Sequence, residues 1–170
     1  SDYYTDNPLF PLRETEAVIA LDSLLLGGPT RDVSIFGVGN SDLEDTARAA
    51  ALLQGREARP EPNPQRGIYF GTDSFSFARA GVPVLYVQGG LDNSARGPVW
   101  GQAQLDDYRQ HRYLQPTDQY AADWDVRGAI SDLALYYEVG LRVTHARRFP
   151  RWYPNSEFRV TRSHGHTPGD

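Results

Sequence analysis

Four residues of this sequence have side chains that could form a chemical site: Asp22, Asp73, Ser74 and Tyr113. Asp22 follows an apolar run, and zinc accepts carboxylate oxygens as ligands. Asp73 and Ser74 could hold a group of a substrate, and the phenol of Tyr113 could donate a hydrogen bond to an oxyanion. Each also has a commoner structural role, which stays open. Asp22 could stabilise a turn, Asp73 and Ser74 could cap a helix, and Tyr113 could lie on the surface.

A nucleophilic set of the serine hydrolase kind could be assembled from Ser74, His111 and Asp118. The sequence has no Gly-x-Ser-x-Gly elbow to present such a serine, so this set is disfavoured. His164 and His166 form a His-x-His pair in a polar tail, where no scaffold would hold a metal in a fixed geometry.

The composition excludes several classes of chemistry. Cys, Met and Lys are absent, which removes disulfides, thiol nucleophiles, thiolate metal sites and Schiff-base chemistry. The net charge is −5 and the arginines are scattered, so nucleic acid is not an expected partner. No apolar run approaches the length of a membrane span. No signal peptide is expected in this sequence, because its first residues do not combine a basic region with an apolar one.

Strands and helices are expected to alternate along the chain. The expected strands are 17–21, 32–36 and 82–87, and the expected helices are 41–53, 74–79 and 126–146. Ser41 and Glu44 have capping-box spacing at the start of the first helix, and Gly55 would end it. In the last helix the apolar residues with three-four spacing are Val126, Ile130, Leu133, Tyr137 and Leu141.

The remaining segments are expected to be irregular. Residues 59–65 carry three prolines and should form a surface connector. Residues 91–104 and 106–120 are expected to be loops, and the second is rich in charged and aromatic residues. Residues 150–154 suggest an aromatic C-terminal strap, and 163–170 suggest a disordered tail.

Two glycines in the stretch Gly37–Asn40 lie between an expected strand and an expected helix. A phosphate-binding loop would need a third glycine and a Lys-Ser or Lys-Thr ending, which this stretch lacks. A tight turn is therefore the preferred interpretation.

The alternation of elements predicts an α/β fold, a three-layer α/β/α sandwich with a mostly parallel or mixed sheet, as a single domain over residues 1–162. In such folds the site lies at the carboxyl ends of the strands. Asp22, the turn at Gly71–Ser74 and the loop after Val87 would converge there.

Three motifs, with flanking Gly81-Val82-Pro83 and Trp124-Asp125, resemble the C-terminal half of the co-catalytic di-zinc exopeptidases, the family of bacterial leucyl aminopeptidase and glutamate carboxypeptidase II. The family pattern Asn-Leu-Asp-Met corresponds to Ala20–Ser23, in which Ala and Ser replace Asn and Met. Arg-Ser-Asp-His-x-x-Phe corresponds to Gly71–Phe77, and Tyr-His-x-x-x-Asp corresponds to Tyr113–Asp118. The resemblance covers nearly all of the chain between Tyr3 and Arg159.

The resemblance implies a site with two zinc ions that share a bridging carboxylate, a glutamate base and a pocket for the free terminus of a peptide. By position, Asp22 would be a zinc ligand and Tyr113 would stabilise the tetrahedral intermediate. Leu114 stands where the family has its last His ligand, and leucine has no lone pair for a metal. Ser74 likewise replaces a motif histidine.

The family's other ligands and its base would come from a segment preceding Tyr3, so this sequence holds only Asp22 of the ligand set. We therefore expect the chain to bind no stoichiometric zinc and to hydrolyse no peptide. Two interpretations stay open: a piece of a metallopeptidase that acts on peptides, or a non-catalytic binding or dimerisation module like the transferrin receptor ectodomain. A sheet edge left uncovered predicts self-association, and the resemblance implies a periplasmic or extracellular location.

Overall fold

A mixed four-stranded sheet forms the centre of the fold. The computed structural model describes residues 1–24 and 26–159. The strand order is β1-β4-β2-β3, in which β1 pairs parallel with β4, β4 antiparallel with β2, and β2 parallel with β3. The strands are β1 Val18–Ala20, β2 Asp32–Phe36, β3 Glu57–Pro60 and β4 Val84–Gly89. The predicted α/β class and mixed sheet are confirmed.

Each face of the sheet carries its own core cluster, because successive side chains of a strand point to opposite faces. On one face, Ile35 and Leu85 pack against two long helices, α2 and α5. On the other face, Phe36 and Tyr86 pack against α3, the 3-10 turn η3 and the C-terminal strap with Trp152. The helices are α1 Asp2–Asp6, α2 Leu43–Leu53, α3 Phe75–Arg79, α4 Gly97–His111 and α5 Arg127–Thr144, and the 3-10 turns are η1 Leu12–Glu14, η2 Pro64–Arg66 and η3 Ile68–Gly71.

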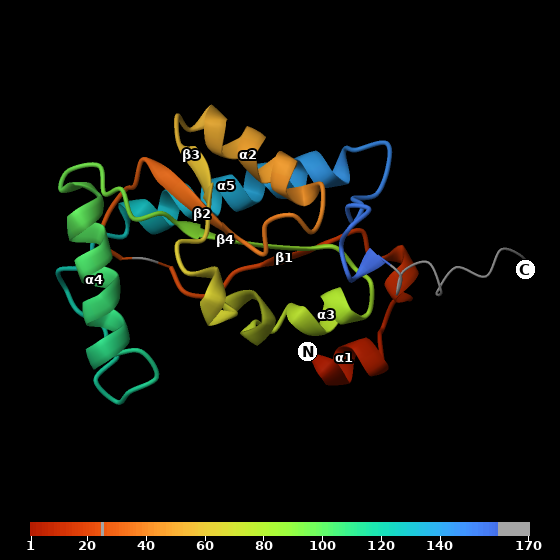
Figure 1. Ribbon diagram of the computed structural model, residues 1–170, viewed down its shortest axis with the longest axis horizontal. Coiled ribbons are helices and arrows are strands. Elements are labelled where there is room, and N and C mark those ends of the chain that lie inside the picture. Colours follow the sequence, from red (N-terminus) through yellow and green to blue (C-terminus); the bar gives the residue numbers. More distant parts are fainter. Residues whose placement is uncertain (25, 160–170) are drawn as a thin grey trace, which may run out of the picture.

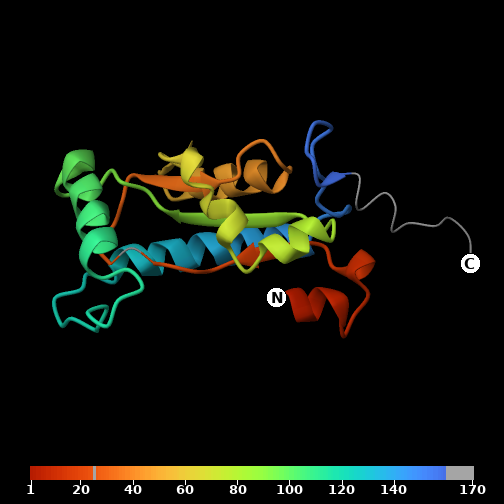
Figure 2. The same cartoon turned by 60° about the horizontal axis from the view of Figure 1, so that its bottom comes forward.

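The helix α4 differs most from the sequence-based expectation. Its residues fall in segments predicted to be loops, yet it runs for 15 residues and none of them is buried. Figures 1 and 2 show it standing across one end of the sheet, away from α1 and α3. A helix that buries no side chain leaves no apolar periodicity in the sequence, which explains why the pattern did not predict it.

The strand β3 was also missed. It overlaps the predicted connector 59–65 and pairs with β2 at the edge of the sheet. Three of its four residues are exposed and its last residue is Pro60. Edge strands tolerate proline and need no apolar alternation, so the usual signals of a strand were absent.

The helix α5 is where it was predicted, but it faces the sheet with a different set of side chains. Leu135, Tyr136 and Val139 are buried. In the predicted apolar set, Ile130 is 61% exposed and Tyr137 is 69% exposed. Both sets follow helical spacing, so the sequence alone did not determine which one the sheet would cover.

The predicted turn before α2 is confirmed, but the predicted capping box is wrong. Gly37 has a φ of +69° and lies so close to the Tyr69 ring that a Cβ atom there would collide with it. Glu44 accepts a hydrogen bond from the backbone N–H of Gly39 instead of closing a box with Ser41. The glycines therefore form a tight turn.

The predicted C-terminal strap is docked on the sheet, where Trp152 is buried and its indole N–H donates to the carbonyl of Gly81 at 2.8 Å. The predicted tail 163–170, with His164 and His166, lies outside the described residues. The single domain over 1–162 stays a prediction. Of the helices in residues 1–24 and 26–159, none combines the length and the apolar character needed to cross a bilayer.

Candidate functional site

Asp22 lies just beyond the carboxyl end of β1, where it is exposed and Ser23 is its one hydrogen-bond partner. The parallel register places Ala20 opposite Tyr86, so the chain after β1 runs beside the end of β4. There the side chain of Gln88 donates one hydrogen bond to the backbone oxygen of Ser23 and another to the hydroxyl of Tyr86. Asp22 and the segment after Val87 thus come together as the sequence predicted.

Tyr113 follows the end of α4, and its ring packs edge-on against Tyr108 at 6.0 Å between centroids. The Tyr113 hydroxyl and the Asp22 carboxylate both affect the pKa of Tyr86. Burial raises the pKa of Tyr86 most, the Asp22 charge raises it further, and Tyr113 adds a smaller effect. Asp22 and Tyr113 therefore both lie near enough to Tyr86 to affect its pKa, although no described hydrogen bond joins either of them to it.

Leu114 has a left-handed backbone conformation, with φ of +58°, and its side chain is 84% exposed. It is the one non-glycine residue with positive φ among those that the structure describes. A branched side chain in this conformation costs about 1–2 kcal/mol. The loop therefore holds position 114 in a specific and unfavourable geometry without burying the leucine.

No described hydrogen bond or ion pair joins the second motif, Gly71–Phe77, to Asp22, Tyr86 or Tyr113. Asp73 is exposed, and Ser74 is buried with its hydroxyl 2.8 Å from that of Thr72. Ser74 is the N-cap residue of α3, but its side chain makes no capping hydrogen bond. Both assignments to a substrate site stay predictions.

The disfavoured nucleophilic set does not form. His111 ends α4 and its Nδ1 lies 3.0 Å from a carboxylate oxygen of Asp107. Asp118 accepts a hydrogen bond from the Tyr108 hydroxyl at 2.9 Å. With Ser74 bonded to Thr72, none of the three members contacts another.

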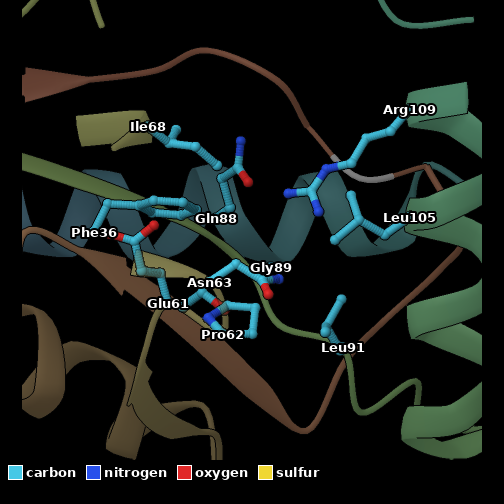
Figure 3. Close-up of a pocket in the computed structure, with 11 residues that line it drawn as sticks. Phe36, Glu61, Pro62, Asn63, Ile68, Gln88, Gly89, Leu91, Leu105 and Arg109 are labelled. Carbon is cyan, nitrogen blue, oxygen red and sulfur yellow. The ribbon is translucent and has the colours of Figure 1, made fainter. Parts of the chain in front are cut away.

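A small cavity on the strap face of the sheet had no counterpart in the sequence analysis. It has a volume of about 20 Å³, room for roughly one water molecule. Figure 3 shows Glu61 beside the ring of Phe36 on one side, and Arg109 reaching in from α4 on the other. Its walls come from β2, the segment after β3, the end of β4 and α4, so no local sequence pattern could reveal it.

A much larger groove of about 820 Å³ lies between α4 and the body of the protein. Trp100, Tyr108 and Trp124 line it, together with residues 26–30 and 90–96. One contact of this helix with the body is at Gly101, which lies so close to the Leu91 carbonyl that a Cβ atom there would collide with it. Leu105 and Arg109, further along α4, line the small cavity beside the end of β4.

A family model, Peptidase family M28, matches residues 1–138. The chain belongs to Peptidase family M28. This is a family of zinc-dependent metallopeptidases, and the matched range contains Asp22, Asp73, Ser74, Tyr113 and Leu114. No curated protein and no solved structure matches the chain.

The described residues do not fit the zinc of Peptidase family M28. Asp22 is exposed, and Leu114 contributes an alkyl side chain that cannot ligate a metal. In residues 1–24 and 26–159 no group of three or more His, Cys, Asp or Glu side chains is arranged to hold a metal ion. A metal-dependent step therefore has no basis in these side chains.

Proposed function

We propose that this chain is a non-hydrolysing domain of Peptidase family M28, which binds a peptide or a protein without cleaving it. The observation that carries the proposal is Leu114. It occupies the position of the last histidine ligand in the motif, beside Tyr113, and its side chain is 84% exposed. A buried leucine could have been retained for packing, but an exposed one in a strained loop has no such role.

A leucine at position 114 weakens a zinc site regardless of which other segments contribute ligands to it. A catalytic zinc site uses three protein ligands and keeps one position open for water. A site that loses a ligand to leucine binds its metal more weakly and no longer holds it in a fixed geometry. Ser74, where the motif has histidine, is a second departure from the family pattern.

What remains of the site suits binding. Asp22 and Tyr113 stay close to Tyr86, and the groove along α4 has the size and aromatic lining of a ligand cleft. We assign Asp73 and Ser74 a contact with the same ligand. We assign Tyr113 a contact with the ligand and no role in catalysis.

The direct test is hydrolysis of aminoacyl-4-nitroanilides and of unblocked dipeptides by this chain, with zinc present in slight excess. We expect no turnover above a blank that contains zinc alone. The Tyr113→Phe variant, which removes the phenol but keeps the ring, should match the wild type. Turnover that a chelator abolishes and that Tyr113→Phe lowers would refute the proposal.

A second candidate function is self-association, which one specific observation favours. The β1 strand is an edge of the described sheet, and α5 carries four exposed apolar side chains, Val126, Ile130, Leu133 and Tyr137. Exposed strand edges and apolar stripes of this kind pair with other chains.

Sedimentation velocity over a hundredfold range of concentration tests this candidate. We expect a dimer whose fraction rises with concentration, and loss of the dimer in Ile130→Glu. The matched control is Ser131→Glu, which introduces the same charge one residue further along α5, on the side of the helix away from the stripe. A monomer at every concentration would rule out self-association.

We also propose a periplasmic or extracellular location, which rests on the family resemblance alone. Fractionation of cells that express the complete reading frame would test it, and recovery of the protein with a cytoplasmic marker would contradict it.

A further inference from the structure

Residues 97–119 comprise the helix α4 and the loop after it, and hydrogen bonds hold the two together. The Tyr108 hydroxyl donates to Asp118 at 2.9 Å, and the Thr117 hydroxyl donates to the backbone oxygen of His111. Backbone hydrogen bonds continue from turn to turn along this loop. The helix and its loop therefore form one rigid body.

The interface of this body with the rest of the protein is poor in polar contacts. In the part of the chain that the structure describes, no hydrogen bond or ion pair links residues 98–119 to any residue beyond the turn at 93–96. Across the interface, the charge of Arg66 lowers the pKa of Arg109 and so repels its guanidinium. The attractive contacts that remain are van der Waals contacts.

Burial shows the same separation. None of the 15 residues of α4 is buried, and among the described helices and strands none packs against it along its length (Figures 1 and 2). The helix α5, in contrast, packs on α2 and β4, and its Tyr136 hydroxyl donates to the Val87 carbonyl. Segments with few buried contacts open at a lower free-energy cost than the core. Residues 97–119 can therefore move while the sheet and α5 stay packed.

Both connections of the segment to the body suit a hinge. At its start, Gly97 has a φ of +78°, which glycine adopts without strain, and its N–H donates to the carbonyl of the buried Asn93. After its end, residues 120–123 have no buried side chain, and the chain rejoins the body where the Asp125 N–H donates to the Leu26 carbonyl. A few residues at the ends of an element commonly absorb the backbone change of such a motion.

The segment covers the groove of about 820 Å³. Trp100 and Tyr108 line it from the α4 side, and Trp124 lines it from the body. Near the start of α4, Gly101 lies against the Leu91 carbonyl, where a Cβ atom would collide. Rotation of the helix about this close contact changes the width of the groove more at Tyr108 than at Trp100.

We propose that residues 97–119 form a lid, which turns as one rigid body about Gly97 and residues 120–123 and so opens and closes the groove. The closed position brings Tyr108 toward Trp124, and the open position exposes both rings. In the proposed function the lid controls entry to the groove. The motion itself belongs to the free chain and does not depend on that function.

The test is the distribution of distances between pairs of nitroxide labels, measured by double electron–electron resonance on the full chain without a ligand. The sequence has no cysteine, so each pair is set by two substitutions. Gln110→Cys with Ala134→Cys reports the distance from the lid to α5. One control pair, Leu52→Cys with Ala134→Cys, joins two packed helices, and the other, Ala103→Cys with Gln110→Cys, lies within the lid. We expect a lid–body distribution about twice as wide as that of either control.

A second measurement uses the close contact at the start of α4. Gly101→Ala adds a Cβ atom that would collide with the Leu91 carbonyl, so it should displace the lid and shift the mean lid–body distance. The midpoint of urea unfolding should stay that of the wild type, because the lid buries no side chain. The matched control is Gly140→Ala on α5, where an added Cβ atom meets nothing within 4 Å and the distance should not change.

Three outcomes would overturn the proposal. A lid–body distribution as narrow as the controls would mean that α4 is fixed, and a broad distribution within the lid would mean that the helix unfolds locally instead of turning. A Gly101→Ala variant that unfolds at lower urea with an unshifted distance would place α4 in the cooperative core. Peptide hydrolysis by the chain would refute the non-hydrolysing function and leave these distances as they are, so the two failures are distinguishable.

Discussion

The two helices α5 and α4 are of similar length but have opposite relations to the core. The α5 helix buries Leu135, Tyr136 and Val139 against the sheet and α2, whereas α4 buries none of its 15 residues. The α5 face also contains a buried ion pair, in which Arg56 and Asp132 lie 2.7 Å apart. The region under α5 is thus packed, whereas α4, which precedes position 114, buries no side chain.

This difference separates residues that the fold needs for its stability from residues that it does not need. A substitution under α5 creates a cavity or an unpaired charge, so selection for folding alone preserves that region. Residues on α4 and in the loop after it are free of this constraint, and Leu114 could replace a ligand without disturbing the core. The predictions below test this division, from the largest expected effect to the smallest.

The buried ion pair should show the largest effect on stability. Arg56→Met leaves the Asp132 carboxylate buried without its cation, in a place where burial already raises its pKa. We expect a loss of about 3–5 kcal/mol in the free energy of unfolding, measured by urea denaturation. The double variant Arg56→Met with Asp132→Leu should recover much of this loss. A single variant as stable as the wild type would contradict the role of the pair.

Truncation of one leucine on each helix compares the two regions directly. Leu135→Ala on α5 removes a side chain that is 1% exposed, and a loss of about 2–5 kcal/mol is expected. Leu105→Ala on α4, where the leucine is only partly buried, should cost less than about 1 kcal/mol. Similar losses in the same denaturation experiment would show that α4 is part of the cooperative core.

Glu61→Gln should raise stability at neutral pH, because it removes a buried charge that no described group neutralises. Since burial raises the pKa of Glu61 in the folded state, its protonated form stabilises the fold at acidic pH, and this contribution is lost as the pH rises through the folded pKa. The variant should therefore be more stable than the wild type by about 1 kcal/mol at pH 7.5 and equal to it below the usual pKa of a glutamate. A difference that does not depend on pH would contradict this assignment.

Leu114→Gly should give the smallest change, a gain of about 0.5–1 kcal/mol. Glycine adopts a positive φ without strain, and the exposed leucine side chain contributes little packing. Thermal unfolding at fixed pH can measure the gain. A loss of stability would mean that the leucine makes a contact that its exposure does not suggest.

The parts of the fold that could be predicted from the sequence are those where local pattern and burial agree. The strands β2 and β4 are largely buried and rich in apolar and β-branched residues. The helix α5 begins where Asp125 accepts a hydrogen bond from the backbone of Arg127. The strand β3 and the helix α4 have no such pattern, because one is an exposed edge and the other buries nothing.

The residues of the candidate site also differ in whether the sequence could predict them. Motif positions indicated Asp22 and Tyr113, which do approach the same tyrosine. Glu61 and Arg109 are far apart in the sequence and line the same cavity only because the segment after β3 and the helix α4 both come close to the end of β4. Neither element was predicted, so the cavity between them could not be.

Zinc titration by calorimetry, on the wild-type chain beside Leu114→His, tests the central claim most directly. The account predicts no stoichiometric binding by the wild type and a gain of weak binding by Leu114→His. Asp22 and Tyr113, the residue before position 114, both affect the pKa of Tyr86, so Asp22 and the new histidine would offer two donors. Tight stoichiometric binding of zinc by the wild type would contradict it.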